Sequence, residues 1–295
     1  MRRLAQIWVL LLFPALLLAS CSGGAAPDVL TTTTILADVA RNVAGDRLTV
    51  GSLLPAGTDP HSYQPVPQDA TMVDRSKVLV VHGVDYEGFL QPLLDTAGGE
   101  ETVIEVSKGV RLHSGIQDEQ TMDPHVWLDP TNVIVYVDNI REGLTQFDPD
   151  GEEVYQTNAS AYIDQLTELD AWINGQVAQI EPKRRVLVTN HEAIGYFAER
   201  YGFIVVGAII PSFSSGSSPS AQQMADLIEQ IKLYEAPAIF LDASDNPDLA
   251  KQIAAETGVK VISDLHLESL TEGGPAGTYI DMMRDNVTKM VQALQ

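Results

Sequence analysis

"PDGEEVYQTNASAYIDQLTELDAWINGQVAQIEPK", residues 149–183, predicts one long helix that organises the whole chain. No glycine or proline interrupts it between Gly151 and Gly175. Its apolar residues recur at steps of three and four, the period of an amphipathic helix. They are Tyr162, Leu166, Leu169, Ile173, Val177 and Ile180. A helix of about 30 residues is roughly 45 Å long. Because that exceeds the core of either half of the chain, we expect it to run across both halves as a strut.

Short apolar, β-branched runs alternate with helical patterns on both sides of this helix. The runs cover residues 29–34, 77–83, 185–189, 203–210, 238–241 and 259–262. This alternation is typical of parallel sheets covered by helices, in an α/β architecture. We therefore predict an N-terminal α/β lobe over 29–148, a linking helix over 149–183 and a C-terminal α/β lobe over 184–295.

The segment "DPTNVIVYVDNIREGLTQFDP", residues 129–149, fits either a strand or a helix. Residues 133–137 alone are typical of a strand. However, Val133, Val137, Ile140, Leu144 and Phe147 continue the helical period for four turns. The longer pattern decides, and we predict a helix.

The N-terminus has the features of a bacterial lipoprotein signal. Arg2 and Arg3 precede an apolar run, and small residues then lead to Cys21, the only cysteine of the chain. Leu18-Ala19-Ser20-Cys21 resembles the lipobox, where cleavage precedes the cysteine and a diacylglycerol is attached to its sulfur. We predict a signal peptide over 1–20 and a lipidated, flexible tether over 21–28.

The chain is strongly acidic. Its 295 residues include 18 basic and 40 acidic side chains, giving a formal charge of −22, and loss of the signal peptide would remove two more arginines. Such a balance repels nucleic acid, and we expect no nucleic-acid partner. A single cysteine also leaves no internal disulfide to stabilise the fold.

Four places in the sequence offer metal ligands. Asp-Pro-His occurs twice, ending at His61 and His125, and in each the proline restricts the loop that carries the imidazole. His191 lies at the junction of an apolar strand and a helix. The loop after the last strand carries Asp264, His266 and Glu268. Three imidazoles and one carboxylate suit a tetrahedral or near-tetrahedral transition-metal site.

Several motifs together resemble one family, the zinc- and manganese-binding solute-binding lipoproteins of metal ABC importers. They are the lipobox, both Asp-Pro-His motifs, "DPHVWLDP" (123–130), "HEAIGYFAERYG" (191–202) and "GPAGTYIDMMRDNV" (274–287). They occur in family order and cover essentially the whole mature chain. The resemblance implies two α/β lobes joined by one long helix, with the metal between them. It also implies a monomer, anchored to the membrane outside the cytoplasm by the lipid on Cys21, that serves an ABC permease and its ATPase.

The family's metal ligands fall here on His61, His125, His191 and an acidic residue of the last loop. In the family this residue stands just before a Ser-Leu pair, about a dozen residues ahead of a Thr-Tyr motif. Glu268 has that position, and Asp264 lies four residues too early, so the resemblance assigns Glu268. For His82, His113 and His266 we expect surface or strand-end positions without a ligand role.

Three function classes follow from these residues. The resemblance implies a binding protein that carries Zn²⁺ or Mn²⁺ as its transported ligand, and the histidine-rich ligand set favours zinc. Zinc importers often have a long histidine-rich loop before the second histidine, whereas "HSGIQDEQTMD" (113–123) is short and has one histidine. The alternatives are a metal-dependent hydrolase and a surface adhesin. A hydrolase normally keeps an open position for water, which four protein ligands would close.

Overall fold

The computed structural model describes residues 26–97, 102–114 and 121–295. The predicted signal peptide and Cys21 lie outside the described residues. Within the described ranges, no helix has both the length and the apolar character needed to cross a bilayer.

The N-terminal lobe is built on a parallel four-stranded sheet with the order β2-β1-β3-β4. Its strands are β1 (Val29–Thr31), β2 (Val50–Ser52), β3 (Val78–Val81) and β4 (Thr102–Glu105). Its helices are α1 (Thr34–Ala44), α2 (Pro67–Arg75) and α3 (Leu90–Ala97). Successive residues of β3 alternate between two cores: Val78 and Val80 pack towards α1, and Leu79 and Val81 towards α2 and α3. Burial on both faces explains why β3 reads as a continuous apolar run.

The C-terminal lobe repeats this plan with a parallel sheet of order β6-β5-β7-β8. Its strands are β5 (Val186–His191), β6 (Ile204–Ile210), β7 (Ala238–Asp242) and β8 (Lys260–Leu265). Its helices are α6 (Gly195–Tyr201), α7 (Ala221–Leu233), α8 (Asp248–Thr257) and α9 (Tyr279–Leu294). The two parallel sheets, each flanked by helices, confirm the predicted α/β fold class.

The apolar runs of the sequence do not include β2 and β4. Both strands lie at an edge of the N-terminal sheet, and apart from the buried Ile104 their residues are partly or largely exposed. An edge strand needs no continuous apolar run, because water covers part of its surface.

The ambiguous segment forms helix α4 (Pro130–Phe147), as its longer period predicts. The Asp129 carboxylate accepts the Thr131 backbone N–H at 2.8 Å and so caps the helix, while Pro130 occupies its first position. The second Asp-Pro pair of "DPHVWLDP" therefore starts a helix that runs directly away from His125.

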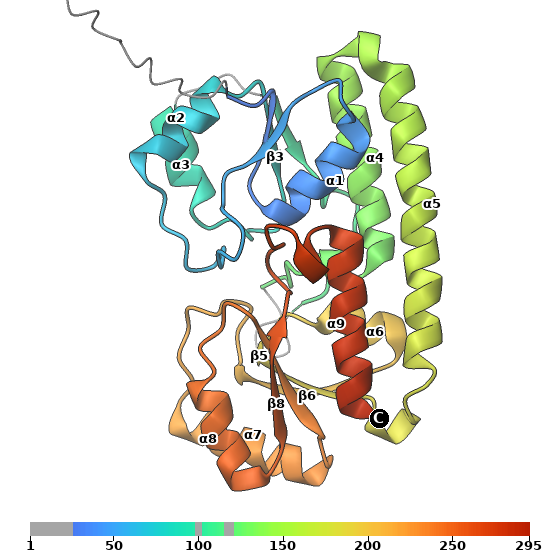
Figure 1. Cartoon of the computed structure of the whole chain (residues 1–295). Coiled ribbons are helices and arrows are strands. Elements are labelled where there is room, and N and C mark those ends of the chain that lie inside the picture. Colours follow the sequence, from blue (N-terminus) through green and yellow to red (C-terminus); the bar gives the residue numbers. More distant parts are fainter. Residues whose placement is uncertain (1–25, 98–101, 115–120) are drawn as a thin grey trace, which may run out of the picture.

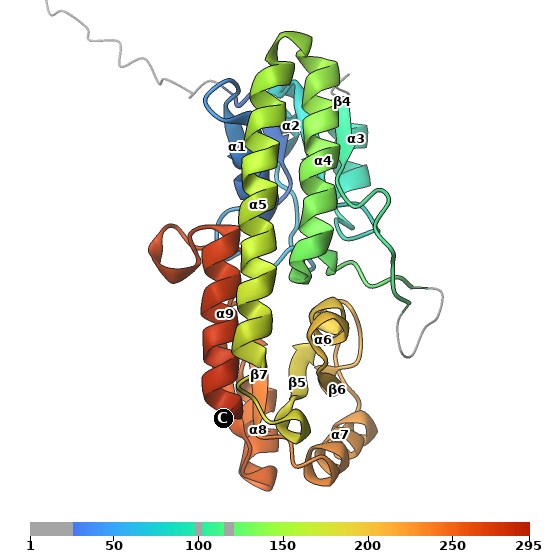
Figure 2. The same ribbon diagram turned by 90° about the vertical axis from the view of Figure 1, so that its right-hand side faces the viewer.

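Helix α5 (Glu152–Val177) spans both lobes. It packs against α1 and α4 beside the N-terminal sheet, and against α6 and α9 beside the C-terminal one (Figures 1 and 2). Its 26 residues extend about 39 Å, slightly less than expected, because Pro149–Gly151 forms a separate 3-10 turn and the helix ends before Ile180. The division into domains at residues 148 and 184 stays a prediction.

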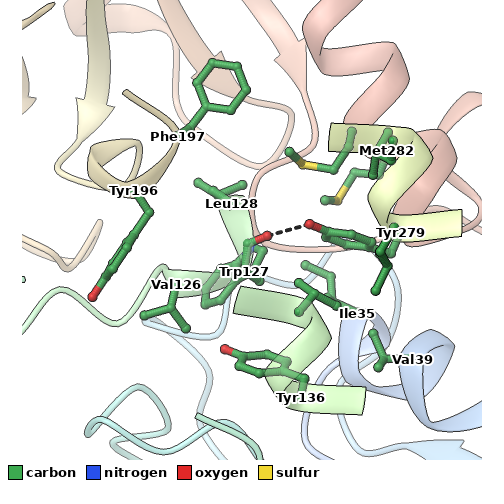
Figure 3. Close-up of a cluster of buried hydrophobic side chains, with 14 of the residues drawn as sticks. Ile35, Val39, Val126, Trp127, Leu128, Tyr136, Tyr196, Phe197, Tyr279 and Met282 are labelled. Carbon is green, nitrogen blue, oxygen red and sulfur yellow. Dashed lines mark hydrogen bonds between the residues drawn. The ribbon is translucent and has the colours of Figure 1, made fainter. Parts of the chain in front are cut away.

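The largest hydrophobic core is shared by the two lobes. It joins the inward faces of both sheets to α4, α5 and α9. At its centre Trp127 and Tyr279 are buried among Ile35, Phe197 and Met282, and the Tyr279 hydroxyl donates to the Trp127 carbonyl at 2.7 Å (Figure 3). A wide separation of the lobes would expose this core to water, so the core favours one relative orientation.

Candidate metal centre

The four predicted ligands follow the carboxyl ends of four strands, two from each sheet. His61 comes after β2 and His125 after β4, while His191 ends β5 and Glu268 follows β8 by three residues. Loops at the carboxyl ends of parallel strands are the usual ligand-binding region of α/β proteins. Here the two sheets bring these ends together, and the four side chains meet between the lobes.

The distances within this cluster match a tetrahedral metal site. The Nε2 atom of His125 lies 3.2 Å from that of His61 and 3.3 Å from that of His191. Glu268 Oε1 lies 3.2 Å from His191 Nε2 and 3.4 Å from His125 Nε2. Glu268 Oε2 lies 3.8 Å from His61 Nε2. A tetrahedron with edges of about 3.3 Å has its centre about 2.0 Å from each corner, which is the usual zinc–nitrogen distance, so the four shorter separations have the size of a zinc site. Among the residues that the structure describes, this is the one group of three or more potential ligand residues close enough to share an ion.

Both Asp-Pro-His motifs form the same turn. In each, the aspartate Oδ1 accepts the histidine backbone N–H at 2.9 Å, between Asp59 and His61 and between Asp123 and His125. Asp123 Oδ1 also lies 2.8 Å from His125 Nδ1. A carboxylate acceptor there holds the proton on Nδ1 and directs Nε2 at a metal. The repeated motif thus fixes the backbone of the histidine in both places, and in the second motif the same aspartate also orients the imidazole.

A glycine leaves room for the Asp123 carboxylate that orients His125. Gly195, the first residue of α6, faces the Asp123 carboxylate, and a Cβ atom at position 195 would lie 2.8 Å from Asp123 Oδ2. The segment "HEAIGYF" therefore serves both sides of the site: it supplies His191 and leaves space for the carboxylate that orients His125.

Glu268 is held through both its side chain and its backbone. The Tyr86 hydroxyl donates to Glu268 Oε2 at 2.8 Å, which leaves Oε1 to face the imidazoles. Asp242 Oδ2 accepts the backbone N–H groups of Leu267 at 2.5 Å and of Glu268 at 3.3 Å. The Trp127 indole N–H donates to the Leu267 carbonyl at 2.8 Å. These contacts fix the position of the Glu268 carboxylate, with Oε1 facing His125 and His191.

Tyr86 comes from a strained turn. Val84 and Asp85 have left-handed backbones, with φ of 56° and 55°, which costs about 1–3 kcal/mol for each such residue. The buried Glu87 carboxylate holds the turn by accepting the backbone N–H groups of His82 at 2.6 Å and Gly83 at 3.2 Å. The strained turn is therefore supported by a buried carboxyl group, and the turn presents the Tyr86 hydroxyl to Glu268.

The electrostatics of the cluster are set by one buried carboxylate among imidazoles. Burial lowers the pKa of His61 to about 4 despite the attraction of Glu268. Burial alone would also lower the pKa of His125, but Glu268 and the hydrogen bond to Asp123 outweigh it and raise that pKa to about 10. Burial opposes the charge of Glu268 too, yet His125 holds its pKa well below the usual range. Without a metal, the one proton of this pair therefore lies on His125, and protonated His125 and ionised Glu268 form an ion pair.

The remaining histidines and Asp264 lie outside the cluster. His82 directly follows β3, as a strand-end residue, but it is almost fully buried and not on the surface; its Nε2 lies 2.6 Å from the Pro124 carbonyl. His113 stacks on Tyr196, and the backbone N–H of His266 donates to Asn286. The Asp264 carboxylate is largely exposed and lies 3.0 Å from Lys289 Nζ. Of the two acidic candidates, only Glu268 reaches the three imidazoles.

The sequence does not predict four residues that orient the ligands: Tyr86, Asp123, Trp127 and Asp242. Asp123 was visible within its motif, and the repeat of Asp-Pro-His could have suggested its role. Tyr86 and Asp242 carry no local signal, because each acts on Glu268 across a large sequence separation.

Two parallel-sheet lobes with a buried cluster of potential metal ligands between them have the arrangement of a two-lobed metal-binding protein. The family model described as "Zinc-uptake complex component A periplasmic" matches residues 29–293. The chain belongs to this family. It is a metal-binding, extracytoplasmic substrate-binding protein of an ABC transporter and not an enzyme.

Individual relatives match nearly the whole chain. The manganese-binding lipoprotein MntA of Halalkalibacterium halodurans is 35% identical over 289 residues, which are 95% of either chain. The manganese ABC transporter substrate-binding lipoprotein PsaA of Streptococcus pneumoniae is 28% identical over 309 residues, covering 100% of this chain and 99% of the relative. The Mn-bound periplasmic metal-binding protein from Candidatus Liberibacter asiaticus superposes with a TM-score of 0.81 at 29% identity, over 90% of this chain and 99% of that one.

Proposed function

We propose that this protein captures a divalent transition metal with His61, His125, His191 and Glu268 and delivers it to an ABC permease, with Zn²⁺ the favoured cargo. The observation that supports this most directly is the convergence of three imidazole Nε2 atoms and the Glu268 carboxylate, with ligand atoms 3.2–3.8 Å apart. Four protein ligands leave no open position for a reacting water, which fits a carrier better than a hydrolase.

The ligand geometry is the argument for zinc. Three nitrogen ligands and a carboxylate whose Oε1 faces His125 and His191 make a site of the size that zinc prefers. Manganese favours more oxygen ligands and six-fold coordination. It is nevertheless the second candidate, because MntA and PsaA carry manganese in their names.

Calorimetric titration of the full-length protein with Zn²⁺ and Mn²⁺, together with metal analysis of protein purified from its native host, tests the proposal. We expect one site that binds zinc more tightly than manganese, and zinc in the native preparation. A protein that binds neither ion, or holds neither as isolated, would refute metal capture. Native protein loaded with manganese would refute the zinc assignment alone.

We further propose that the mature protein is a monomer anchored by a diacylglycerol on Cys21, with its metal centre on the outer side of the membrane. The lipobox-like sequence before Cys21 supports this, as do the lipoprotein names of the relatives. The permease and its ATPase would be the partners. Mass spectrometry of the membrane-extracted protein would detect the lipid, and light scattering would report the oligomeric state.

A further inference from the structure

The loop that carries His61 is held differently from the elements that carry the other three ligands. The side chains of His125, His191 and Glu268 are 0–2% exposed, whereas that of His61 is 7% exposed. His61 also borders a pocket of about 520 Å³ that opens beside Phe213 and Met122. His61 is thus the one ligand of the four that lies at the mouth of the site.

Two serine hydroxyls from the C-terminal lobe tie this loop in place. Ser215, in the loop between β6 and α7, donates to Asp59 Oδ2 at 2.6 Å. Ser269, next to Glu268, accepts the Gly57 backbone N–H at 2.8 Å. Asp59 in turn accepts the His61 backbone N–H through Oδ1. One carboxylate therefore links the turn that aims His61 to a loop of the opposite lobe.

The Ser215 loop is shaped to reach Asp59. The Ser212 hydroxyl accepts the Ser214 backbone N–H at 3.1 Å, and the Ser212 carbonyl accepts the Glu192 backbone N–H at 2.9 Å. These contacts connect the loop to the segment just after His191. The loop thus starts from a fixed point beside the metal centre and extends to the turn of His61.

We propose that Ser215 is a positioning residue that acts through Asp59 as a latch: it holds the His61 turn on the metal, and breaking its hydrogen bond lets His61 swing away as the first step of metal release. This inference rests on the proposed metal binding. The path is local, because the shared core around Trp127 and Tyr279 favours a fixed lobe orientation. Release then needs only a short loop to move at the mouth of the site.

Ser62 provides a matched control. Its hydroxyl donates to the same oxygen, Asp59 Oδ2, at 3.1 Å, but it belongs to the same turn as His61. Removing Ser62 or Ser215 takes one donor from the same carboxylate, and only loss of Ser215 removes the hydrogen bond that joins Asp59 to the opposite lobe. If Ser215 only helped to shape the Asp-Pro-His turn, Ser215→Ala and Ser62→Ala would change the rate of zinc release equally.

The test is stopped-flow measurement of zinc release into excess chelator, with the full-length zinc-loaded protein in detergent. We expect Ser215→Ala to release zinc about 10-fold faster than wild type, equivalent to about 1.4 kcal/mol, with the unfolding temperature of the metal-free protein unchanged. Ser215→Thr, which keeps the hydroxyl, and Ser62→Ala should stay within about 2-fold of wild type by the same conversion. Equal release rates for Ser215→Ala and wild type, or equal acceleration by both alanine variants, would overturn the latch. A wild-type protein that takes up no zinc would instead refute the proposed function.

Discussion

Metal binding should expel about one proton per ion even at pH 8, because the metal must displace the proton that Glu268 and His125 share. The pKa of His125 is raised to about 10, so this imidazole is almost fully protonated at pH 8 in the metal-free protein. His61, with its pKa lowered to about 4, is already neutral there and releases nothing. An imidazole with an ordinary pKa of about 6.5 would be only about 3% protonated at the same pH.

The sign of the pH dependence follows directly. Below the raised pKa, each unit of increasing pH lowers the concentration of the proton that competes for His125 tenfold and raises the apparent zinc affinity about tenfold. Between pH 7 and pH 9 the affinity should therefore rise about 100-fold, where a site of ordinary histidines would have levelled off. Because the proton belongs to the coupled pair, its release reports on His125 and Glu268 together.

Calorimetry in several buffers of different ionisation enthalpy measures this proton. The slope of the observed binding enthalpy against buffer ionisation enthalpy gives the number of protons released, and we expect about one at pH 8. Asp123→Asn removes one of the two carboxylates that raise the pKa of His125, so the pH midpoint of proton release should move down. A slope near zero at pH 8 in the wild-type protein would show that the ion pair does not exist.

Three further outcomes follow from other parts of the molecule. Glu268→Ala should weaken zinc binding at least about 10-fold. Asp264→Ala alters only an exposed ion pair with Lys289 and should leave the zinc affinity nearly unchanged in the same titration. The reverse order of effects would contradict the ligand assignment. Tyr279→Phe leaves the buried Trp127 carbonyl without its hydrogen-bond donor. Denaturant titration should show a free energy of unfolding lower by about 1–3 kcal/mol. A loss below about 0.5 kcal/mol would argue that this hydrogen bond does not stabilise the contact between the lobes. Cys21→Ala should abolish lipid attachment, and a variant that still carries diacylglycerol on mass analysis would disprove the lipobox.

The architecture could be predicted from the sequence wherever burial leaves a periodic pattern. Strand β3 and helix α5 are buried along whole faces, so their apolar periods are visible, whereas the edge strands β2 and β4 show none. The start of α5 was less predictable, because the residues Pro149–Gly151 just before it form a 3-10 turn, which differs from the α-helix only in its hydrogen-bond pattern.

The four candidate ligands could be predicted because they lie in recognisable motifs, but the residues that orient them could not. The histidine positions follow from the two Asp-Pro-His motifs and from the resemblance of "HEAIGYFAERYG", and the choice of Glu268 from a spacing. The side chains that orient these residues could not be predicted, because Tyr86, Asp242 and Trp127 reach Glu268 or its neighbour from elements 25 to 182 residues away in sequence. Such contacts exist only after both sheets and the shared core have formed.

The same contacts explain how a buried site can be both selective and reversible. His125 and Glu268 are oriented by groups inside the shared core, including Asp123, Asp242 and the Trp127 indole. His191 ends a fully buried strand, so its position is set by the C-terminal sheet. In the proposed site these three residues would form a rigid face that favours a small ion, because a larger ion would require several buried hydrogen bonds to shift at once. His61 completes the coordination from a loop at the mouth of the site, where loss of one ligand disturbs none of those bonds. Selectivity and release can therefore be altered separately, the first by substitutions around Glu268 and the second by substitutions around Asp59.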